Sequence, residues 1–253
     1  MSPENTTEAL LDVAREFASR AHVPYSRRAA SAAVLLPDGG IVAGVRVESA
    51  SFPLTIPAAL NAVTTAVAMG HRELVALAVA GPVPASTTAL ASGFGLLPAG
   101  DRFWCWNGAV PTPRDVRSPF IVQANGDMIA LAREAARRAH IPESEFPVGA
   151  VLRTRDGRLI PGCNVEHPDW TCILCAERNA LGTAVTYDAL PAEMLALSCP
   201  TAPDASPCGA CRQLIFELIR DATITIDRGA KPAERISPSS LLPGAFSGSA
   251  LSS

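Results

Sequence analysis

The chain has 253 residues, of which 24 are acidic and 21 are lysine or arginine, so its formal net charge is −3. That balance offers no basic surface to hold a phosphate backbone, and nucleic acid is therefore a disfavoured partner. The longest apolar stretch, 74–85, is interrupted by glycine and proline and is far shorter than the roughly 20 residues that span a bilayer. The first eleven residues lack the basic and apolar pattern of a signal peptide, so we expect a cytoplasmic protein without membrane contact.

The chain contains seven cysteines, which is an odd number. A disulfide framework is not expected in a chain without a secretion signal, because disulfides persist mainly in oxidising compartments. Cysteines that cluster in such a chain are better interpreted as metal ligands or catalytic groups.

An internal repeat divides the sequence. A shift of 118 residues aligns 14–67 with 132–185 without a gap, which predicts two homologous copies in tandem. Identical residues coincide at 14–16 and 132–134, at 21–22 and 139–140, at 38–39 and 156–157, and at 61–62 and 179–180.

The same order of elements is expected in both copies. A helix (10–21 and 128–139) leads into a strand, an Asp-Gly turn and a second strand, which is the pattern of a hairpin. A second helix follows at 57–69 and 175–187. The second copy continues with a strand at 195–199, a helix opened by Pro207 and a strand at 223–227. Helices alternating with short strands predict the α/β class, in two or three layers.

Composition divides the chain into three segments. We expect a first domain at 1–98 and a second at 120–253. The segment 99–119 between them is rich in proline, glycine and arginine without a clear period, and is expected to be a connection.

Two short segments of the second copy carry the residues with chemistry. Residues 171–178 read Thr-Cys-Ile-Leu-Cys-Ala-Glu-Arg, and residues 207–213 read Pro-Cys-Gly-Ala-Cys-Arg-Gln. Both lie at expected helix amino-termini, where free backbone N–H groups and the helix dipole favour thiolates. We expect Cys175, Cys208 and Cys211 to hold one zinc ion, which leaves the fourth tetrahedral position to a water whose pKa falls to about 7.

Glu177 follows the ligand Cys175 by two residues. It is expected to face the water without binding the metal, and so to act as a proton shuttle during attack on a ring carbon. Arg178 is expected to hydrogen-bond a thiolate and offset the negative charge of three sulfurs.

These motifs make the chain resemble the cytidine deaminase family in its small-subunit, three-cysteine form. The resemblance covers 129–246 with the catalytic motifs and, more weakly, the first copy without them. Residues 146–150 resemble the family's Phe-x-Val-Gly-Ala strand, residues 162–166 its ribose-binding strand, and residues 241–246 its Leu-Leu-Pro-x-x-Phe ending. The resemblance implies two three-layer α/β/α domains in tandem, with one zinc ion per chain in the carboxy-terminal domain.

The resemblance also implies a reaction and a set of substrate contacts. The reaction is the hydrolytic deamination of cytidine, deoxycytidine or a closely related amino-pyrimidine nucleoside, as in pyrimidine salvage, with zinc-activated hydroxide attacking C4 and Glu177 carrying the protons. Asn164 and Glu166 are then expected on the sugar hydroxyls, and Phe146 and Ala176 are further expected substrate contacts.

The first copy departs from the family pattern. Pro57 and Ala59 stand where the second copy has Cys175 and Glu177, so this copy cannot bind zinc in the same way. It keeps 48–55, Glu-Ser-Ala-Ser-Phe-Pro-Leu-Thr, which resembles a loop that completes a neighbouring subunit's site in the family. We therefore expect the first copy to lend Phe52 and Tyr25 to the second, in a homodimer of two-domain chains equivalent to a tetramer.

Three alternatives stay open. Cys172 could join the other cysteines as a fourth ligand, which would close the water position and make the zinc structural. The residues from His167 to Trp170, which replace the family's loop sequence, favour a specialised nucleoside or an antibiotic as substrate. A zinc-stabilised scaffold without turnover is the non-enzymatic alternative.

Overall fold

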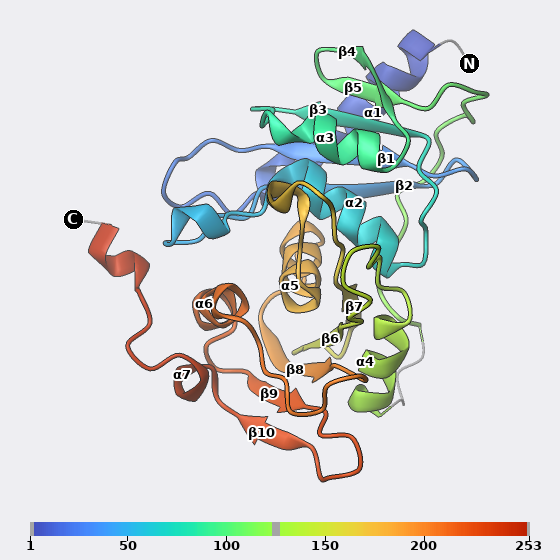
Figure 1. The fold of residues 1–253 in the computed structure, drawn as a ribbon. Coiled ribbons are helices and arrows are strands. Elements are labelled where there is room, and N and C mark those ends of the chain that lie inside the picture. The colour runs from blue at the N-terminus through green and yellow to red at the C-terminus, as the bar shows by residue number, and fades with distance from the viewer. Residues whose placement is uncertain (1–2, 123–126, 252–253) are drawn as a thin grey trace.

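The computed structural model describes residues 3–122 and 127–251 (Figure 1). Each copy of the repeat builds one five-stranded sheet, with the order β2-β1-β3-β5-β4 in the first and β10-β9-β8-β6-β7 in the second. The prediction of two α/β copies in tandem is confirmed.

The first copy contains three helices and five strands among the described residues. They are α1 (Pro3–Phe17), β1 (Ser31–Leu35), β2 (Ile41–Val45), α2 (Ala58–Ala68), β3 (Ala76–Ala80), α3 (Ser86–Gly93), β4 (Leu97–Gly100) and β5 (Phe103–Cys105), with short 3-10 turns at Ala18–Arg20 and Phe52–Leu54.

The helices and strands of the second copy follow the gap in the described residues, although Ile121, before the gap, already pairs with Leu159. It contains α4 (Met128–Ala136), β6 (Gly149–Thr154), β7 (Leu159–Cys163), α5 (Ala176–Thr186), β8 (Ala192–Ser198), α6 (Gly209–Leu218), β9 (Thr223–Ile226), β10 (Glu234–Ile236) and α7 (Pro238–Leu241), with 3-10 turns at Trp170–Cys172 and Gly248–Leu251.

Alternating side chains divide each copy into three layers. On β1, Ala33 and Leu35 pack with α1, whereas Ala32 and Val34 face the opposite way into the core that contains α2. The second sheet repeats the pattern, with α4 on one face and with α5 and α6 on the other. The cores of the two copies are continuous, because α2 and α5 pack on each other between the sheets (Figure 1).

A close approach of helix and sheet places the start of α5. A Cβ atom at Gly162 on β7 would overlap the backbone of Ala176 and Ala180, so a larger residue there would push α5 away from the sheet. Gly44 is the equivalent residue of the first copy and lies against α2 in the same way.

The last two strands of the copies differ. In the second copy α6 crosses between β8 and β9, which are parallel. In the first copy β5 pairs antiparallel with β3, and β4 lies outside it. The segment 99–119 is therefore not simply a connection: Phe103 and Trp104 are buried in the first sheet, and Val116 pairs with Ile41 at the edge of β2.

No helix within 3–122 and 127–251 combines the length and the apolar character needed to cross a membrane.

Candidate active site

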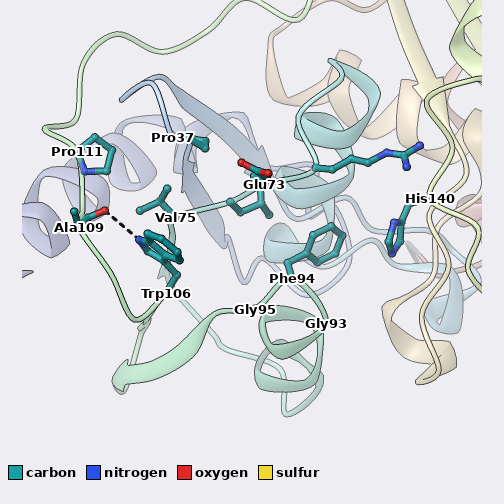
Figure 2. A pocket seen from close by; sticks show the side chains of 12 residues that line it. Pro37, Glu73, Val75, Gly93, Phe94, Gly95, Trp106, Ala109, Pro111 and His140 are labelled. Carbon is teal, nitrogen blue, oxygen red and sulfur yellow. Dashed lines mark hydrogen bonds between the residues drawn. The ribbon is translucent and has the colours of Figure 1, made fainter.

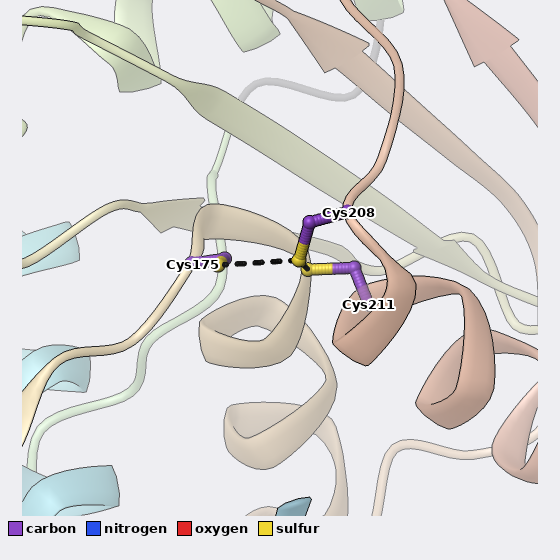
Figure 3. A group of neighbouring side chains, drawn as sticks. All are labelled: Cys175, Cys208 and Cys211. Carbon is purple, nitrogen blue, oxygen red and sulfur yellow. Dashed lines mark hydrogen bonds between the residues drawn. The ribbon is translucent and has the colours of Figure 1, made fainter. Parts of the chain in front are cut away.

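Three cysteine sulfurs meet in the second copy (Figure 3). The Sγ atoms of Cys175 and Cys208 are 3.8 Å apart, and those of Cys208 and Cys211 are 3.5 Å apart. Thiolates bound to one tetrahedral zinc ion at about 2.3 Å lie about 3.8 Å from each other. The cluster therefore fits a single zinc ion with three protein ligands.

Two helix amino-termini bring the sulfurs together. Cys175 is the N-cap residue of α5 and Cys208 is the N-cap residue of α6, with Cys211 in the first turn. The loop before Cys208 is held by Arg212, whose guanidinium donates to the Pro207 carbonyl at 2.6 Å and to the Ser206 hydroxyl at 2.7 Å. The positive ends of two helix dipoles thus face the same cluster.

The protonation of the cluster favours a cation. The pKa of Cys208 is lowered, because the two neighbouring sulfurs and the backbone N–H groups at the start of α6 favour its thiolate. The contact with Cys208 and burial raise the pKa of Cys175 to about 12, and the other two sulfurs raise the pKa of Cys211. Without a metal, the negative charge of one thiolate raises the pKa of its neighbours. A bound divalent cation would offset that repulsion and allow all three cysteines to lose their protons.

Glu177 lies in the first turn of α5, and its side chain is only 3% exposed. Burial raises the pKa of its carboxyl to about 7, and the charge of nearby Cys208 acts in the same direction. Ala176, which precedes it, is fully buried. A carboxyl that is shielded from bulk water next to the cluster is suited to proton transfer there.

Arg178 contacts the first copy. Its Nη2 donates to the Leu54 carbonyl at 2.8 Å, and its buried Nε has no hydrogen-bond partner. The expected hydrogen bond from Arg178 to a thiolate is not formed among the described residues. The side chain instead fastens the start of α5 to the 3-10 turn that contains Phe52.

Asn164 and Glu166 hold the segment that leads into β6. The Asn164 amide donates to the Phe146 carbonyl at 2.9 Å and accepts from the Val148 N–H at 2.8 Å. The Glu166 carboxylate accepts from the backbone N–H groups of Glu143 and Ser144 and from the Ser144 hydroxyl.

The same three hydrogen bonds recur in the first copy, where Glu48 accepts from Tyr25 N–H, Ser26 N–H and the Ser26 hydroxyl. This arrangement is therefore structural in both copies. A carboxylate has about four acceptor positions, so Glu166 keeps capacity for a ligand hydroxyl. Phe146 is 36% exposed.

Cys172 and His167 belong to the contact with α3 of the first copy. The Cys172 thiol is buried and donates to the Ser86 carbonyl at 3.4 Å, and it is not part of the three-sulfur group. Nδ1 of His167 accepts from the Asp169 N–H at 2.9 Å, so its Nε2 carries the proton and donates to the Ala89 carbonyl at 3.1 Å. Both ring nitrogens of His167 are thus engaged: Nε2 joins the copies, and Nδ1 holds the His167 loop itself.

Trp170, in the same loop, is 85% exposed, so its indole is available to a ligand or to another chain.

The loop 49–54 of the first copy is bound to α6, the helix that carries two of the cysteines. The Glu217 carboxylate accepts from the Ser49 hydroxyl at 2.7 Å and from the Ala50 N–H at 2.9 Å. Gln213, one turn earlier, donates to Glu217 at 2.6 Å and to the Phe246 carbonyl at 2.8 Å. Sequence reasoning missed Gln213 and Glu217. Residues four apart lie on the same face of a helix, so their spacing could have indicated a polar face of α6 that contacts another part of the chain.

Tyr25 and Phe52, the expected cross-domain residues, form a pair within this loop region. Their ring centroids are 6.2 Å apart with an interplanar angle of 66°, and Phe52 is 61% exposed. The pair therefore presents an open aromatic surface next to a loop that is fixed on α5 and α6 by Arg178 and Glu217.

Both copies match models of one family. The description of each model is the cytidine and deoxycytidylate deaminase zinc-binding region, and the matched residues are 123–226 for one and 1–80 for the other.

Individual relatives correspond to about half of the chain. Cytidine deaminase of Sporosarcina psychrophila is 39% identical over 121 residues, which cover 47% of this chain and 89% of the relative. Cytidine deaminase of Halalkalibacterium halodurans is 37% identical over 120 residues, covering 47% of this chain and 91% of the relative. A crystal structure of cytidine deaminase from Burkholderia pseudomallei has 36% identity and a TM-score of 0.45, and covers 47% of this chain and 96% of that chain.

Proposed function

Because the chain belongs to the cytidine and deoxycytidylate deaminase family, we propose that it hydrolyses the exocyclic amine of cytidine or deoxycytidine, releasing ammonia and uridine or deoxyuridine. The observation that carries this proposal is the group of Cys175, Cys208 and Cys211 with Glu177 buried in the first turn of the helix that Cys175 begins. Ultraviolet absorbance of cytidine incubated with the zinc-loaded chain tests it directly.

The roles of the residues follow from this arrangement. The three cysteines hold one zinc ion as thiolates, and the ion when bound supplies a water whose pKa is lowered to about 7. Glu177 takes a proton from the attacking water and gives it to ring N3 as the C–O bond forms at C4. Glu177 then moves the hydroxyl proton to the exocyclic nitrogen, the C4–N bond breaks, and ammonia leaves.

Substrate contacts form the next part of the proposal. Asn164 and Glu166 each hydrogen-bond the loop and still have free acceptor positions, which bind the sugar hydroxyls. Phe146 and Ala176 lie against the nucleoside. The exposure of Phe146 supports this assignment, since an aromatic ring open to solvent can cover a planar base.

The first copy acts in this proposal as a permanent neighbour of the second. Its loop 49–54 contributes Phe52, backed by Tyr25, to the catalytic pocket. Two observations support that role: Arg178, next to Glu177, donates to the Leu54 carbonyl, and Glu217 on the helix of Cys208 and Cys211 accepts from the Ser49 hydroxyl and the Ala50 N–H. We also propose the domain division at 1–98, 99–119 and 120–253, with the first sheet extended by β5.

A homodimer of two-copy chains in the cytoplasm, acting in pyrimidine salvage, completes the proposal. Each relative corresponds to about half of this chain, so a dimer of this chain would contain four copies of the domain and would be equivalent to a tetramer of single-domain chains. Large apolar side chains that remain exposed, Trp170 and Ile173 among them, would be covered in such a dimer. The mass of the assembly in solution tests this part.

A specialised nucleoside is the second candidate substrate. His167 does not support it, because both nitrogens of its ring already have protein partners, one in each copy. Trp170 does support it, since an 85% exposed indole in the loop before Cys175 can stack on a group that cytidine lacks. Comparison of turnover on cytidine and on base-modified nucleosides separates the candidates, and zinc binding without turnover on any of them would favour the scaffold.

A further inference from the structure

A cavity of about 660 Å³ opens where the two copies meet (Figure 2). Residues of the first copy form most of its lining, and His140 of the second copy closes one side. None of the three clustered cysteines, nor Glu177, lines it. Its volume lies within the range of about 300–1,000 Å³ that small-molecule sites occupy.

Two aromatic side chains stand on either side of the cavity. The Trp106 ring is held by its Nε1, which donates to the Ala109 carbonyl at 3.1 Å. The Phe94 ring packs on His140, with centroids 5.4 Å apart. In Figure 2 Glu73 lies between these two rings, and Val75, which is buried and precedes β3, lies next to Trp106. Rings fixed in this way favour a flat ligand, because stacking then requires little ordering of the protein.

The charged groups of the lining differ in what they have already bound. Arg72 donates to the Ala139 carbonyl at 2.8 Å and so is engaged with the second copy. The Glu73 carboxylate makes no hydrogen bond or ion pair with any residue of 3–122 or 127–251. Burial lowers the pKa of His140, and the charge of Arg72 acts in the same direction, so the neutral imidazole is favoured. Glu73 is exposed at the cavity, and its carboxylate is free to accept hydrogen bonds from N–H groups of a ligand.

We propose that this junction cavity is a second binding site, which takes a planar heteroaromatic base carrying an exocyclic amine. The amine donates to Glu73 while the ring stacks on Trp106, with the Phe94 and His140 pair at the far end. An analogue that lacks the amine offers no donor to the carboxylate at that position and would bind more weakly. The base is bound there without being hydrolysed, because the clustered cysteines and Glu177 do not line the cavity.

The position of His140 connects the cavity to the catalytic copy. Its backbone N–H donates to the Asn164 carbonyl at 3.0 Å, and its carbonyl accepts from the Glu166 N–H at 2.8 Å. A ligand that presses on the His140 ring therefore acts on the two residues assigned to the sugar. Occupancy of the cavity should change the KM for cytidine, and this consequence rests on the proposed function.

Binding to the zinc-loaded full chain tests the site with two matched pairs of probes, adenine with purine and cytosine with pyrimidin-2-one. Each pair differs only in the exocyclic amine, and the two pairs distinguish a purine from a pyrimidine occupant. Calorimetry should show at least tenfold tighter binding of an amine-bearing probe than of its partner. Glu73→Gln should remove that preference, Trp106→Ala should weaken binding at least tenfold, and Glu8→Gln, on the exposed face of α1, should change neither.

The outcomes separate this proposal from the function of the catalytic site. Equal affinity for probes with and without the amine, or binding that survives both Glu73→Gln and Trp106→Ala, would overturn the cavity as the site, whether or not cytidine is turned over. Unchanged melting temperatures of the variants guard against misfolding. A KM for cytidine that shifts at least twofold in saturating adenine, and does not shift in Glu73→Gln, supports the link through His140; an unchanged KM in the parent chain would overturn that link.

Discussion

The hydroxyl oxygens of Thr65 and Thr183 lie 2.8 Å apart in the buried contact between α2 and α5. The two residues occupy equivalent positions in the two copies, because the copies are related by a shift of 118 residues. Equivalent residues of the repeat therefore contact each other here. Further contacts are exchanged in the same way: Arg20 donates to the Thr186 carbonyl, and Arg138, its equivalent, donates to the Ala68 carbonyl. The copies are thus related by a pseudo-twofold axis, and the copy without cysteine ligands supplies matched controls for the other.

The first prediction uses such a pair, Glu166 and Glu48. Both carboxylates make the same three hydrogen bonds to their own loops, so Glu166→Gln should lower the free energy of unfolding by about 1 kcal/mol. Glu48→Gln should lower it by at least as much, because Glu48 is buried and also pairs with Arg46. Only Glu166→Gln should raise the KM for cytidine at least about tenfold, because only Glu166 is assigned to the sugar. Steady-state kinetics with denaturant unfolding checks this. Equal KM values for the two variants would mean that Glu166 only stabilises its loop and does not bind the sugar.

Zinc content provides the second prediction. Cys208→Ser should lower bound zinc from about one ion per chain to well below that, because it removes one of three sulfurs from the cluster. Cys172→Ser should leave zinc content unchanged, since the Cys172 thiol contacts the Ser86 carbonyl in the other copy. Elemental analysis of both purified variants decides the matter. Loss of zinc from Cys172→Ser would instead favour a closed, four-cysteine structural site.

Glu217 is the subject of the third prediction. Glu217→Gln weakens the charged acceptor that binds the Ser49 hydroxyl and the Ala50 N–H, and so loosens the loop of Phe52. The KM for cytidine should rise about tenfold with a much smaller change in kcat, since substrate contacts and not the proton path are disturbed. Zinc content should stay at the level of the parent chain. Glu8→Gln, on the exposed face of α1, is the matched control. A KM for cytidine that is unchanged in Glu217→Gln would show that this loop does not reach the substrate.

Acid stability gives the fourth prediction, at the ion pair of Arg133 and Asp227. The Arg133 guanidinium, helped by the Ser198 hydroxyl, lowers the pKa of Asp227 to about 2. A lowered carboxyl pKa contributes stability above about pH 4, and this contribution is lost as the pH falls toward 2. Arg133→Leu should therefore melt below the parent chain at pH 6, and the gap should narrow between pH 4 and pH 2.

Arg137→Leu is the control for that measurement. Arg137 pairs with the half-exposed Glu134 on the same helix, where an ion pair adds little to stability. Its melting temperature should stay close to that of the parent chain at every pH. A gap for Arg133→Leu that is constant from pH 6 to pH 2 would mean that Asp227 does not titrate in this range.

The local parts of the site could be predicted from the sequence. Cys175 and Cys208 begin helices, as their positions before apolar helical patterns indicate, and the hairpins turn at the two Asp-Gly pairs. These features depend on residues close together in the chain. The repeat helped with the second helix of each copy, found at Ala58–Ala68 and Ala176–Thr186, whereas the first helix begins at Pro3 and not at the expected residue 10.

The contacts between the copies could not be predicted in this way. Glu217 and Ser49 are 168 residues apart, and their hydrogen bond depends on how α2 packs against α5. His167 and Cys172 looked like pocket or metal residues because their partners, Ala89 and Ser86, lie in a helix that the sequence did not single out. The position of β5 was missed because tertiary pairing with β3, and not a local periodic pattern, makes it a strand.

Deamination of cytidine with Glu177 as the proton carrier can be measured in one assay. Conversion of cytidine to uridine is followed by ultraviolet absorbance with the parent chain and with Glu177→Gln, both at one zinc ion per chain. We expect turnover by the parent chain. Without the proton carrier, Glu177→Gln should lose about 10²–10⁴-fold in kcat at similar zinc content. Equal turnover by both, or no turnover of cytidine or deoxycytidine by the zinc-loaded parent chain, would contradict it.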